Sequence, residues 1–195
     1  LSALAAFAAR EGLSGLEFAG GIPGTLGGAV TMNAGAYGGE MKDVIVSAKV
    51  MDEEGAVQEL SCEELQLGYR TSIVQKKQFV VLEAEFLLKP GTTEEIQNTM
   101  KELNAKRREK QPLEYPSAGS TFKRPEGYFA GKLIEDAGLR GYRVGDAQVS
   151  EKHCGFVVNR GKATCAEVLQ LIGDVQKTVK EQFGVQLEPE VRIIR

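Results

Sequence analysis

Residues 20–39 constrain the fold of this chain more than any other part of its sequence. The segment reads GGIPGTLGGAVTMNAGAYGG, contains eight glycines and one proline, and carries no charged side chain. Flexible linkers are typically rich in serine or charge, whereas glycine is needed where the backbone approaches another group closely or where φ is positive. On the residues alone, a tight structural corner and a backbone cradle for a phosphate or diphosphate are equally compatible with this segment.

Two common nucleotide-binding patterns do not match this segment. A Walker A loop is excluded because no Gly-Lys-Ser/Thr follows, and the dinucleotide GxGxxG pattern is excluded by the spacing and by the lack of a preceding strand. The second part of the segment adds the amide of Asn33 and the phenol of Tyr37 to a surface of small residues. Such a surface suits a flat heteroaromatic ligand with polar edges.

Composition excludes several classes of protein. The chain has 195 residues and a net charge of −3, with a pI near 5.4, whereas a nucleic-acid platform is strongly basic. No apolar run reaches the length that spans a membrane. The three cysteines are widely spaced and form no CxxC pair, so we expect neither a zinc site nor a disulfide framework, and we expect a reducing compartment. The chain begins with Leu1, and we expect a segment before it.

The periodicity of apolar residues predicts a mixed α+β fold, because helices and strands do not alternate strictly. Helices are predicted at residues 1–10, 61–64, 92–110, 129–137 and 166–183. Strands are predicted at residues 44–51, 56–60, 79–88, 142–149, 155–159 and 185–195. The prolines within residues 112–125 indicate a boundary between two units.

Three short motifs carry side chains that could take part in chemistry. Arg70, in GYRTS, is flanked by small polar residues and could bind a carboxylate or phosphate in a bidentate manner, although a surface arginine is the alternative. Ser120, in SAGSTFK, has no GxSxG context and no signature linking it to the only histidine, which argues against a serine hydrolase. A serine can instead donate a proton to a strongly basic carbon such as an enolate; an ordinary turn is the alternative. Glu190 and Arg192 share one face if residues 185–195 form a strand, unless this is a solvated edge.

Six segments, taken in order along the chain, resemble one known family. They are the glycine-rich segment, LGYRTS (67–72), PSAGSTFKRP (116–125), GYFAGKLIEDAGLRG (127–141), HCGFVVN (153–159) and LEPEVRII (187–194). Their order is similar to that in the UDP-N-acetylenolpyruvoylglucosamine reductase family, and the resemblance covers essentially the whole chain. The short link from Ser120 to the helix predicted at residues 129–137 resembles the shorter-loop form of that family.

The resemblance implies an α+β fold that combines part of a split FAD-binding domain with a substrate-binding domain. Residues 1–109 would be the second FAD-binding subdomain, which is incomplete, and residues 110–187 the substrate-binding domain. Residues 188–195 would form a strand that returns to the FAD-binding side. The first FAD-binding subdomain, with its own phosphate loop, is expected before Leu1.

The resemblance also implies a reaction in peptidoglycan precursor synthesis. NADPH reduces FAD, and the flavin N5 passes a hydride to the β-carbon of the enolpyruvyl ether of UDP-N-acetylglucosamine enolpyruvate. Protonation at the α-carbon then gives UDP-N-acetylmuramate. By this resemblance the protein is a cytoplasmic monomer with FAD and NADPH as cofactors, without metal, nucleic acid or membrane. The alternative is a sugar-nucleotide or flavin-binding module without turnover.

Site residues follow by carrying the family motifs over position by position. Ser120 is then the proton donor, and Arg70 and Glu190 polarise the substrate carboxylate and stabilise the enolate. The cofactor-binding residues implied are Gly21, Ile22, Pro23, Gly24, Thr25, Gly27, Gly28, Asn33, Ala36, Tyr37 and Gly38. The substrate-binding residues implied are Tyr69, Lys123, Tyr128, His153 and Asn159.

Overall fold

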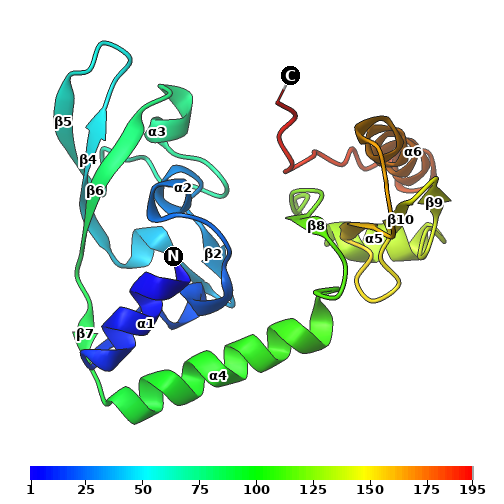
Figure 1. The fold of residues 1–195 in the computed structure, drawn as a ribbon. Coiled ribbons are helices and arrows are strands. Elements are labelled where there is room, and N and C mark those ends of the chain that lie inside the picture. Colours follow the sequence, from blue (N-terminus) through cyan, green and yellow to red (C-terminus); the bar gives the residue numbers. More distant parts are fainter. Residues whose placement is uncertain (195) are drawn as a thin grey trace. The chain divides into compact units, whose positions relative to one another are not determined.

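The computed structural model describes residues 1–194 and contains two compact units, Leu1–Arg107 and Arg108–Arg195. Each unit has its own hydrophobic core. Helices and antiparallel strands are mixed in both units (Figure 1). The α+β prediction is therefore confirmed, while the roles predicted for residues 1–109, 110–187 and 188–195 stay predictions.

The first unit is built around a three-stranded antiparallel sheet with the order β5-β4-β6. Its strands are β4 (Ile45–Met51), β5 (Val57–Ser61) and β6 (Val80–Phe86). Ala48 and Val50 of the central strand are fully buried, whereas Lys49 between them is exposed, as the two-residue period of a strand requires. Short helices α2 (Leu26–Thr31) and α3 (Ile73–Lys76) contact each other, and α2 contacts β6 (Figure 1).

The remaining elements of the first unit are short, apart from two longer helices. They are α1 (Ser2–Arg10), β1 (Leu13–Ser14), η1 (Glu17–Gly21), β2 (Gly35–Ala36), β3 (Gly39–Glu40), η2 (Met41–Asp43), β7 (Lys89–Pro90) and α4 (Thr93–Lys110). Strand β1 pairs with β7, and β2 pairs with β3. Helix α4 buries only Ile96 completely and continues to Lys110, past the boundary between the units.

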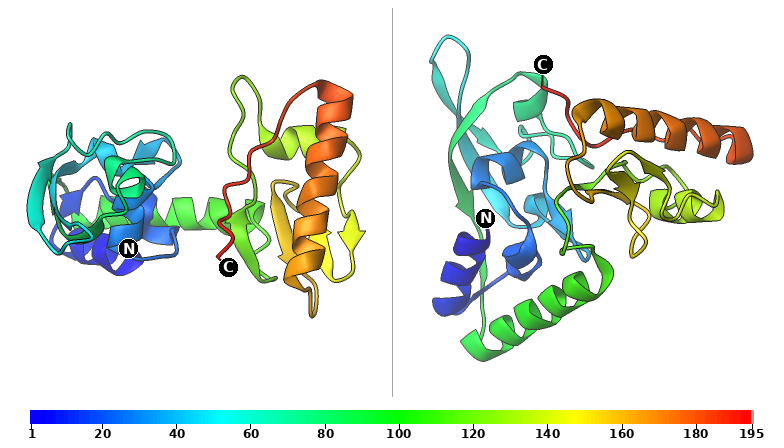
Figure 2. Two further views of the ribbon diagram at one scale, coloured as in Figure 1. Left: turned by 90° about the horizontal axis from the view of Figure 1, so that it is seen from above. Right: turned by 45° about the vertical axis from the view of Figure 1, so that its right-hand side comes forward.

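The second unit contains a four-stranded antiparallel sheet with the order β8-β11-β10-β9. Its elements are β8 (Ser117–Ser120), α5 (Ala130–Asp136), β9 (Arg143–Val144), β10 (Ala147–Val149), β11 (Phe156–Asn159) and α6 (Cys165–Phe183). Helix α6 contacts α5, β9 and β10, and Figure 2 shows it alongside the strands.

Helix α6 has clear sequence signals at both ends. The hydroxyl of Thr164 accepts a hydrogen bond from the amide of Glu167, and the Glu167 carboxylate accepts one from the amide of Thr164, which is the capping-box arrangement. Gly184 ends the helix with φ +69°, a conformation that glycine adopts without strain. One face buries apolar side chains at helical spacing: Leu171, Ile172, Val175 and Val179.

Three predicted elements are wrong. Ser61 is the last residue of β5, and residues 62–66 form a hydrogen-bonded turn instead of a helix, with Gln66 at φ +47°. Residues 142–149 form two strands, β9 and β10, because Gly145 adopts φ +55° between them. Residues 185–194 form no regular strand; only the isolated bridge between Phe122 and Pro189 is present there. Residue 195, the end of that predicted strand, lies outside the described residues.

Candidate functional site

The first part of the glycine-rich segment places backbone, without bulky side chains, at the surface. Gly24 has φ +126°, which only glycine tolerates, and a Cβ added there would meet no atom within 4 Å. Thr25 begins α2, and its hydroxyl accepts a hydrogen bond from the amide of Gly28 at 3.1 Å. The first amides of a helix have no partner within the helix. Residues 23–25 are exposed, and because Pro23 has no N–H, the backbone donors that this stretch can offer to an anion are the amides of Gly24 and Thr25.

The second part of the segment is a hairpin whose tip is fixed by two residues. Tyr37 and Gly38 join β2 to β3 with φ of +54° and +87°, the positive values of a two-residue hairpin turn. The Tyr37 ring is exposed, and the guanidinium carbon of Arg107 lies 5.8 Å from its centroid. The Nε of Arg107 is buried and has no hydrogen-bond partner among the described residues. A Cβ at Gly21 would lie 2.6 Å from that Nε, so a larger residue there would require the Arg107 side chain to move.

These features fit an anionic flavin cofactor. The segment offers exposed backbone donors, an aromatic ring at a hairpin tip and an unpaired guanidinium donor beside Gly21. Such groups are the ones that bind a diphosphate and a flat heteroaromatic ring. The assignment of the individual cofactor-binding residues stays a prediction.

Arg70 lies at the tip of a tight turn in the first unit. Gly68 and Thr71 exchange two backbone hydrogen bonds, of 3.1 and 3.2 Å, so that Tyr69 and Arg70 form the tip. Arg70 has φ +55°, a left-handed conformation that costs a non-glycine residue roughly 1 kcal/mol. Its guanidinium carbon lies 5.3 Å from the centroid of the exposed Tyr69 ring. A strained arginine of this kind persists only where the surroundings fix it.

Two buried polar side chains join this turn to the glycine-rich segment. The Asn33 amide donates hydrogen bonds to the Gly68 carbonyl at 3.2 Å and to Glu40 at 2.9 Å. The Ser72 hydroxyl donates one to the carbonyl of Thr31 at 2.7 Å. Sequence reasoning missed Ser72 altogether; its only local signal is its place as the N-cap of α3, where it accepts a bond from the amide of Gln75.

Ser120 ends strand β8 in the second unit. It pairs with Phe156 of β11, is exposed, and follows Gly119, which has φ +83°. The next residue, Thr121, is buried, and its hydroxyl accepts a hydrogen bond from the amide of Val157 at 3.0 Å. The structure therefore presents the Ser120 side chain at the surface from a backbone that is fixed on both sides.

Glu190 is paired through its main chain with Thr121, the residue that follows Ser120. The amide of Glu190 donates to the carbonyl of Thr121, and the amide of Lys123 donates to the carbonyl of Glu188, each at 2.8 Å. Leu187 anchors the segment, because its side chain is fully buried in the core of the second unit. Ser120 and Glu190 thus belong to the second unit, on two segments that are joined at Thr121, while Arg70 belongs to the first unit.

The predicted substrate-binding residues of the second unit have different surroundings. The ammonium of Lys123 forms an ion pair with Glu188. Tyr128 is exposed and ends a turn that begins at Pro125. The side-chain oxygen of Asn159 accepts two backbone hydrogen bonds, at 2.9 and 3.0 Å, and so its carbonyl end is used within the loop.

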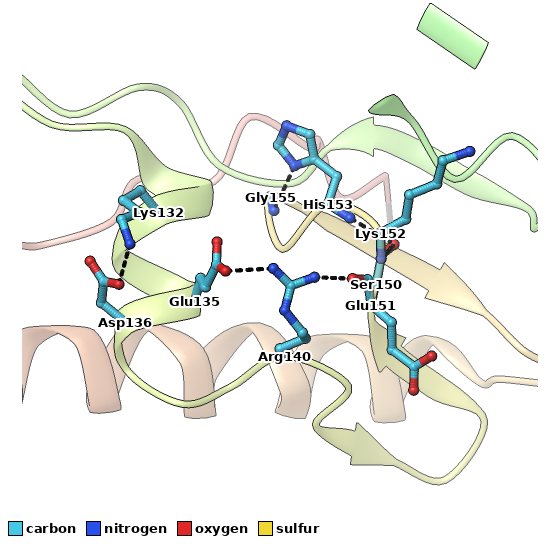
Figure 3. Close-up of polar contacts among 9 residues, drawn as sticks. All are labelled: Lys132, Glu135, Asp136, Arg140, Ser150, Glu151, Lys152, His153 and Gly155. Carbon is cyan, nitrogen blue, oxygen red and sulfur yellow. Dashed lines mark hydrogen bonds and ion pairs between the residues drawn. The ribbon is translucent and has the colours of Figure 1, made fainter. Parts of the chain in front are cut away.

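His153 lies in a compact loop between β10 and β11 (Figure 3). Its Nδ1 accepts a hydrogen bond from the amide of Gly155 at 3.0 Å, so the neutral ring carries its proton on Nε2. Burial lowers the pKa of His153, and the positive charge of Arg140 lowers it further. Arg140 contacts Glu135 at 2.6 Å and also donates to the carbonyl of Glu151, which connects α5 to the loop. Within the described residues no hydrogen bond links His153 to Ser120.

No helix among residues 1–194 is both long and apolar enough to cross a bilayer. No group of three or more potential metal ligands was found in the same part of the chain.

Comparisons with known families match both units. Residues 1–61 match the family described as FAD binding domain. Residues 111–194 match the family described as UDP-N-acetylenolpyruvoylglucosamine reductase, C-terminal domain.

Curated relatives match the chain along its whole length. A UDP-N-acetylenolpyruvoylglucosamine reductase from Lachnoclostridium phytofermentans is 67% identical over 194 residues, which are 100% of this chain and 63% of the relative. One from Caldanaerobacter subterraneus subsp. tengcongensis is 59% identical, with 100% and 64% covered. The chain therefore spans somewhat less than two thirds of these relatives.

A solved structure agrees with these matches. The crystal structure of UDP-N-acetylenolpyruvylglucosamine reductase from Thermus caldophilus is 42% identical to this chain and superposes with a TM-score of 0.84. The match covers 96% of this chain and 68% of that one. At 42% identity the two proteins are alike in sequence as well as in fold.

Proposed function

This chain belongs to the UDP-N-acetylenolpyruvoylglucosamine reductase family, and from that premise we propose that it reduces UDP-N-acetylglucosamine enolpyruvate to UDP-N-acetylmuramate with FAD and NADPH. The family matches and the full-length identity to curated relatives support the proposal. Cytoplasmic location and a monomeric state stay predictions.

The first unit would hold the cofactor. Bound FAD would supply the hydride, taken from NADPH, that adds to the β-carbon of the enolpyruvyl double bond. The backbone of residues 21–28 and the hairpin tip at Tyr37 and Gly38 are the groups that we assign to its diphosphate and ring, with Arg107 beside Gly21 as a further donor.

Ser120 would complete the reduction by protonating the α-carbon. Hydride addition at the β-carbon leaves a carbanion at the α-carbon that is delocalised into the carboxylate, and this carbon is basic enough to take a hydroxyl proton. Ser120 suits the role because it is exposed at the end of a paired strand, and because the next residue, Thr121, pairs with Glu190. The main-chain bond between Thr121 and Glu190 is the single structural observation that carries the proposal.

Arg70 and Glu190 would act on the substrate carboxylate. A guanidinium binds a carboxylate through two parallel hydrogen bonds, and it stabilises the negative charge that develops during hydride addition. The strained backbone of Arg70 is consistent with a side chain whose position matters for function. The proposal assigns Tyr69, Lys123, Tyr128, His153 and Asn159 to the rest of the sugar nucleotide.

A rapid-mixing experiment on the holoenzyme tests the role of Ser120. In Ser120→Ala, the reduction of the flavin by NADPH should stay normal, while its reoxidation by the enolpyruvyl sugar nucleotide should slow by about 100- to 10,000-fold, the usual contribution of a general acid. Ser117→Ala is the matched control, because Ser117 lies at the other end of the same exposed strand. Normal reoxidation in Ser120→Ala would remove Ser120 from the proposal. Wild-type protein that binds both ligands without turnover would instead identify a binding module.

A further inference from the structure

The side chain of Asn33 forms three hydrogen bonds within the protein. Its side chain is 1% exposed, and all of its bonds lie inside the first unit. The amide nitrogen donates to Glu40 and to the Gly68 carbonyl, and the amide oxygen accepts a bond from the amide of Lys42 at 3.0 Å. Because both ends of the amide are used, the side chain is satisfied without a ligand.

The backbone conformation of residue 33 also favours asparagine. Asn33 has φ +43°, and asparagine is one of the few non-glycine residues that adopts this conformation readily. The residue lies in the middle of the short stretch, residues 32–34, between α2 and β2. Asparagine therefore serves two needs at this position: a left-handed backbone and two amide donors in a buried site.

The bond from Asn33 to Gly68 controls the turn that carries Arg70. The Gly68 carbonyl also accepts the amide of Thr71 at 3.2 Å, so both of its lone pairs are engaged at the start of the turn. At the other end of the turn, the fully buried Ser72 donates to the carbonyl of Thr31. Both flanks of Tyr69-Arg70 are thus attached to residues 31–33.

This double attachment explains how Arg70 keeps an unfavourable φ. A left-handed arginine returns to an ordinary conformation unless its flanks are fixed, and here each flank has one buried hydrogen bond to the same short segment. We propose that Asn33 is a positioning residue for Arg70: its amide fixes the turn at residues 68–71 in register with the glycine-rich segment, so that the arginine meets the substrate carboxylate in a defined place. This inference rests on the proposed function, because it uses the role assigned there to Arg70.

The test compares Asn33→Gly with a matched control in the flavin-loaded holoenzyme. Glycine keeps the left-handed backbone at residue 33 and removes only the amide. Gln78→Gly is the control, since Gln78 also has a left-handed φ, of +55°, but is exposed. Flavin content, the rate of flavin reduction by NADPH and the rate of reoxidation by substrate are measured for both variants.

The proposal predicts a selective effect. Asn33→Gly should keep its flavin and its rate of reduction within about twofold, while reoxidation by substrate slows about 10- to 100-fold, the effect of a small misplacement of a reacting group. The dissociation constant for UDP-N-acetylmuramate, followed by the flavin spectrum, should rise as well. Gln78→Gly should match the wild type in each measurement.

A double-mutant cycle separates positioning from general support. In an Arg70→Ala background, Asn33→Gly should slow reoxidation no further, because the group that it positions is gone. Full additivity, equal losses in the two half-reactions, loss of flavin, or no effect would each overturn the proposal. If Asn33→Gly does not fold, Ser72→Ala, which releases the other flank, is put through the same cycle and decides by the same criteria. Wild-type protein that is not reoxidised by substrate would refute the proposed function instead.

Discussion

Thr121 provides the sharpest test of how the second unit holds its candidate catalytic residues. Its side chain is 3% exposed, and its hydroxyl is the acceptor for the amide of Val157 at 3.0 Å. Its own amide donates to Gly155, and its carbonyl accepts from Glu190, each at 2.8 Å. Thr121 therefore connects β8, β11 and the segment that carries Glu190.

The substitution Thr121→Val replaces the hydroxyl with a methyl group and leaves the shape of the side chain nearly unchanged. Valine keeps the volume but leaves the buried amide of Val157 without an acceptor, and an unpaired buried amide costs about 1–3 kcal/mol. Thr121→Ser is the matched variant: it keeps the hydroxyl and loses one methyl group, at about 1 kcal/mol. We expect the valine variant to be the less stable of the two.

Amide hydrogen exchange, read residue by residue, is the assay, because two units need not unfold in a single transition. In Thr121→Val the Val157 amide should exchange about 5- to 150-fold faster than in the wild type, the factor that corresponds to 1–3 kcal/mol. In Thr121→Ser the exchange rate of the Val157 amide should rise by no more than about fivefold, which corresponds to 1 kcal/mol. A Val157 amide that is equally protected in the valine variant would refute the reasoning, since the hydroxyl would then not be its essential acceptor.

Two further predictions concern groups in the same unit. The chain has one histidine, so an NMR titration gives a single imidazole curve, and its midpoint should fall below the ordinary value of 6.5 because burial and then Arg140 lower the pKa of His153. Since the pKa is lower in the folded state, the fold should lose stability as the pH falls from about 6.5 to the folded midpoint. A midpoint above 6.5 would contradict this account. Thr164→Ala should cost about 1 kcal/mol in urea denaturation by breaking the capping box of α6, whereas a loss as small as that of Thr178→Ala, a mid-helix control, would show that the cap is unimportant.

The elements that could be predicted from the sequence are those with local signals. Helix α6 has its cap at Thr164, its apolar face and its terminal Gly184 within one stretch of chain, and the prediction missed its start by one residue. The hairpin of β9 and β10 was predicted as one strand, because alternation continues across Gly145 and only the backbone conformation reveals the turn. The end of the chain was predicted as a strand, but it makes only a single bridge.

Part of the candidate site could be predicted from local sequence signals, and part of it could not. The motifs around Arg70, Ser120 and Glu190 could be found because each is a short run of residues in a recognisable order. The bonds that fix these residues could not, because they join positions far apart: Asn33 reaches Gly68 over 35 residues and Ser72 reaches Thr31 over 41. Partners at such separations are determined by the packing of the whole fold, and no local sequence pattern predicts them.

The segment that carries Glu190 is held by main-chain bonds, by the buried Leu187 and by the ion pair between Lys123 and Glu188. The main-chain bonds use the Glu188 carbonyl and the Glu190 amide, so a proline at residue 190 removes one of them, whereas other substitutions keep both the donor and the acceptor. These two bonds require no particular side chain at residue 190, so Glu190→Gln and Glu190→Ala should keep them. The backbone of this segment can therefore stay paired while the chemistry at residue 190 is changed.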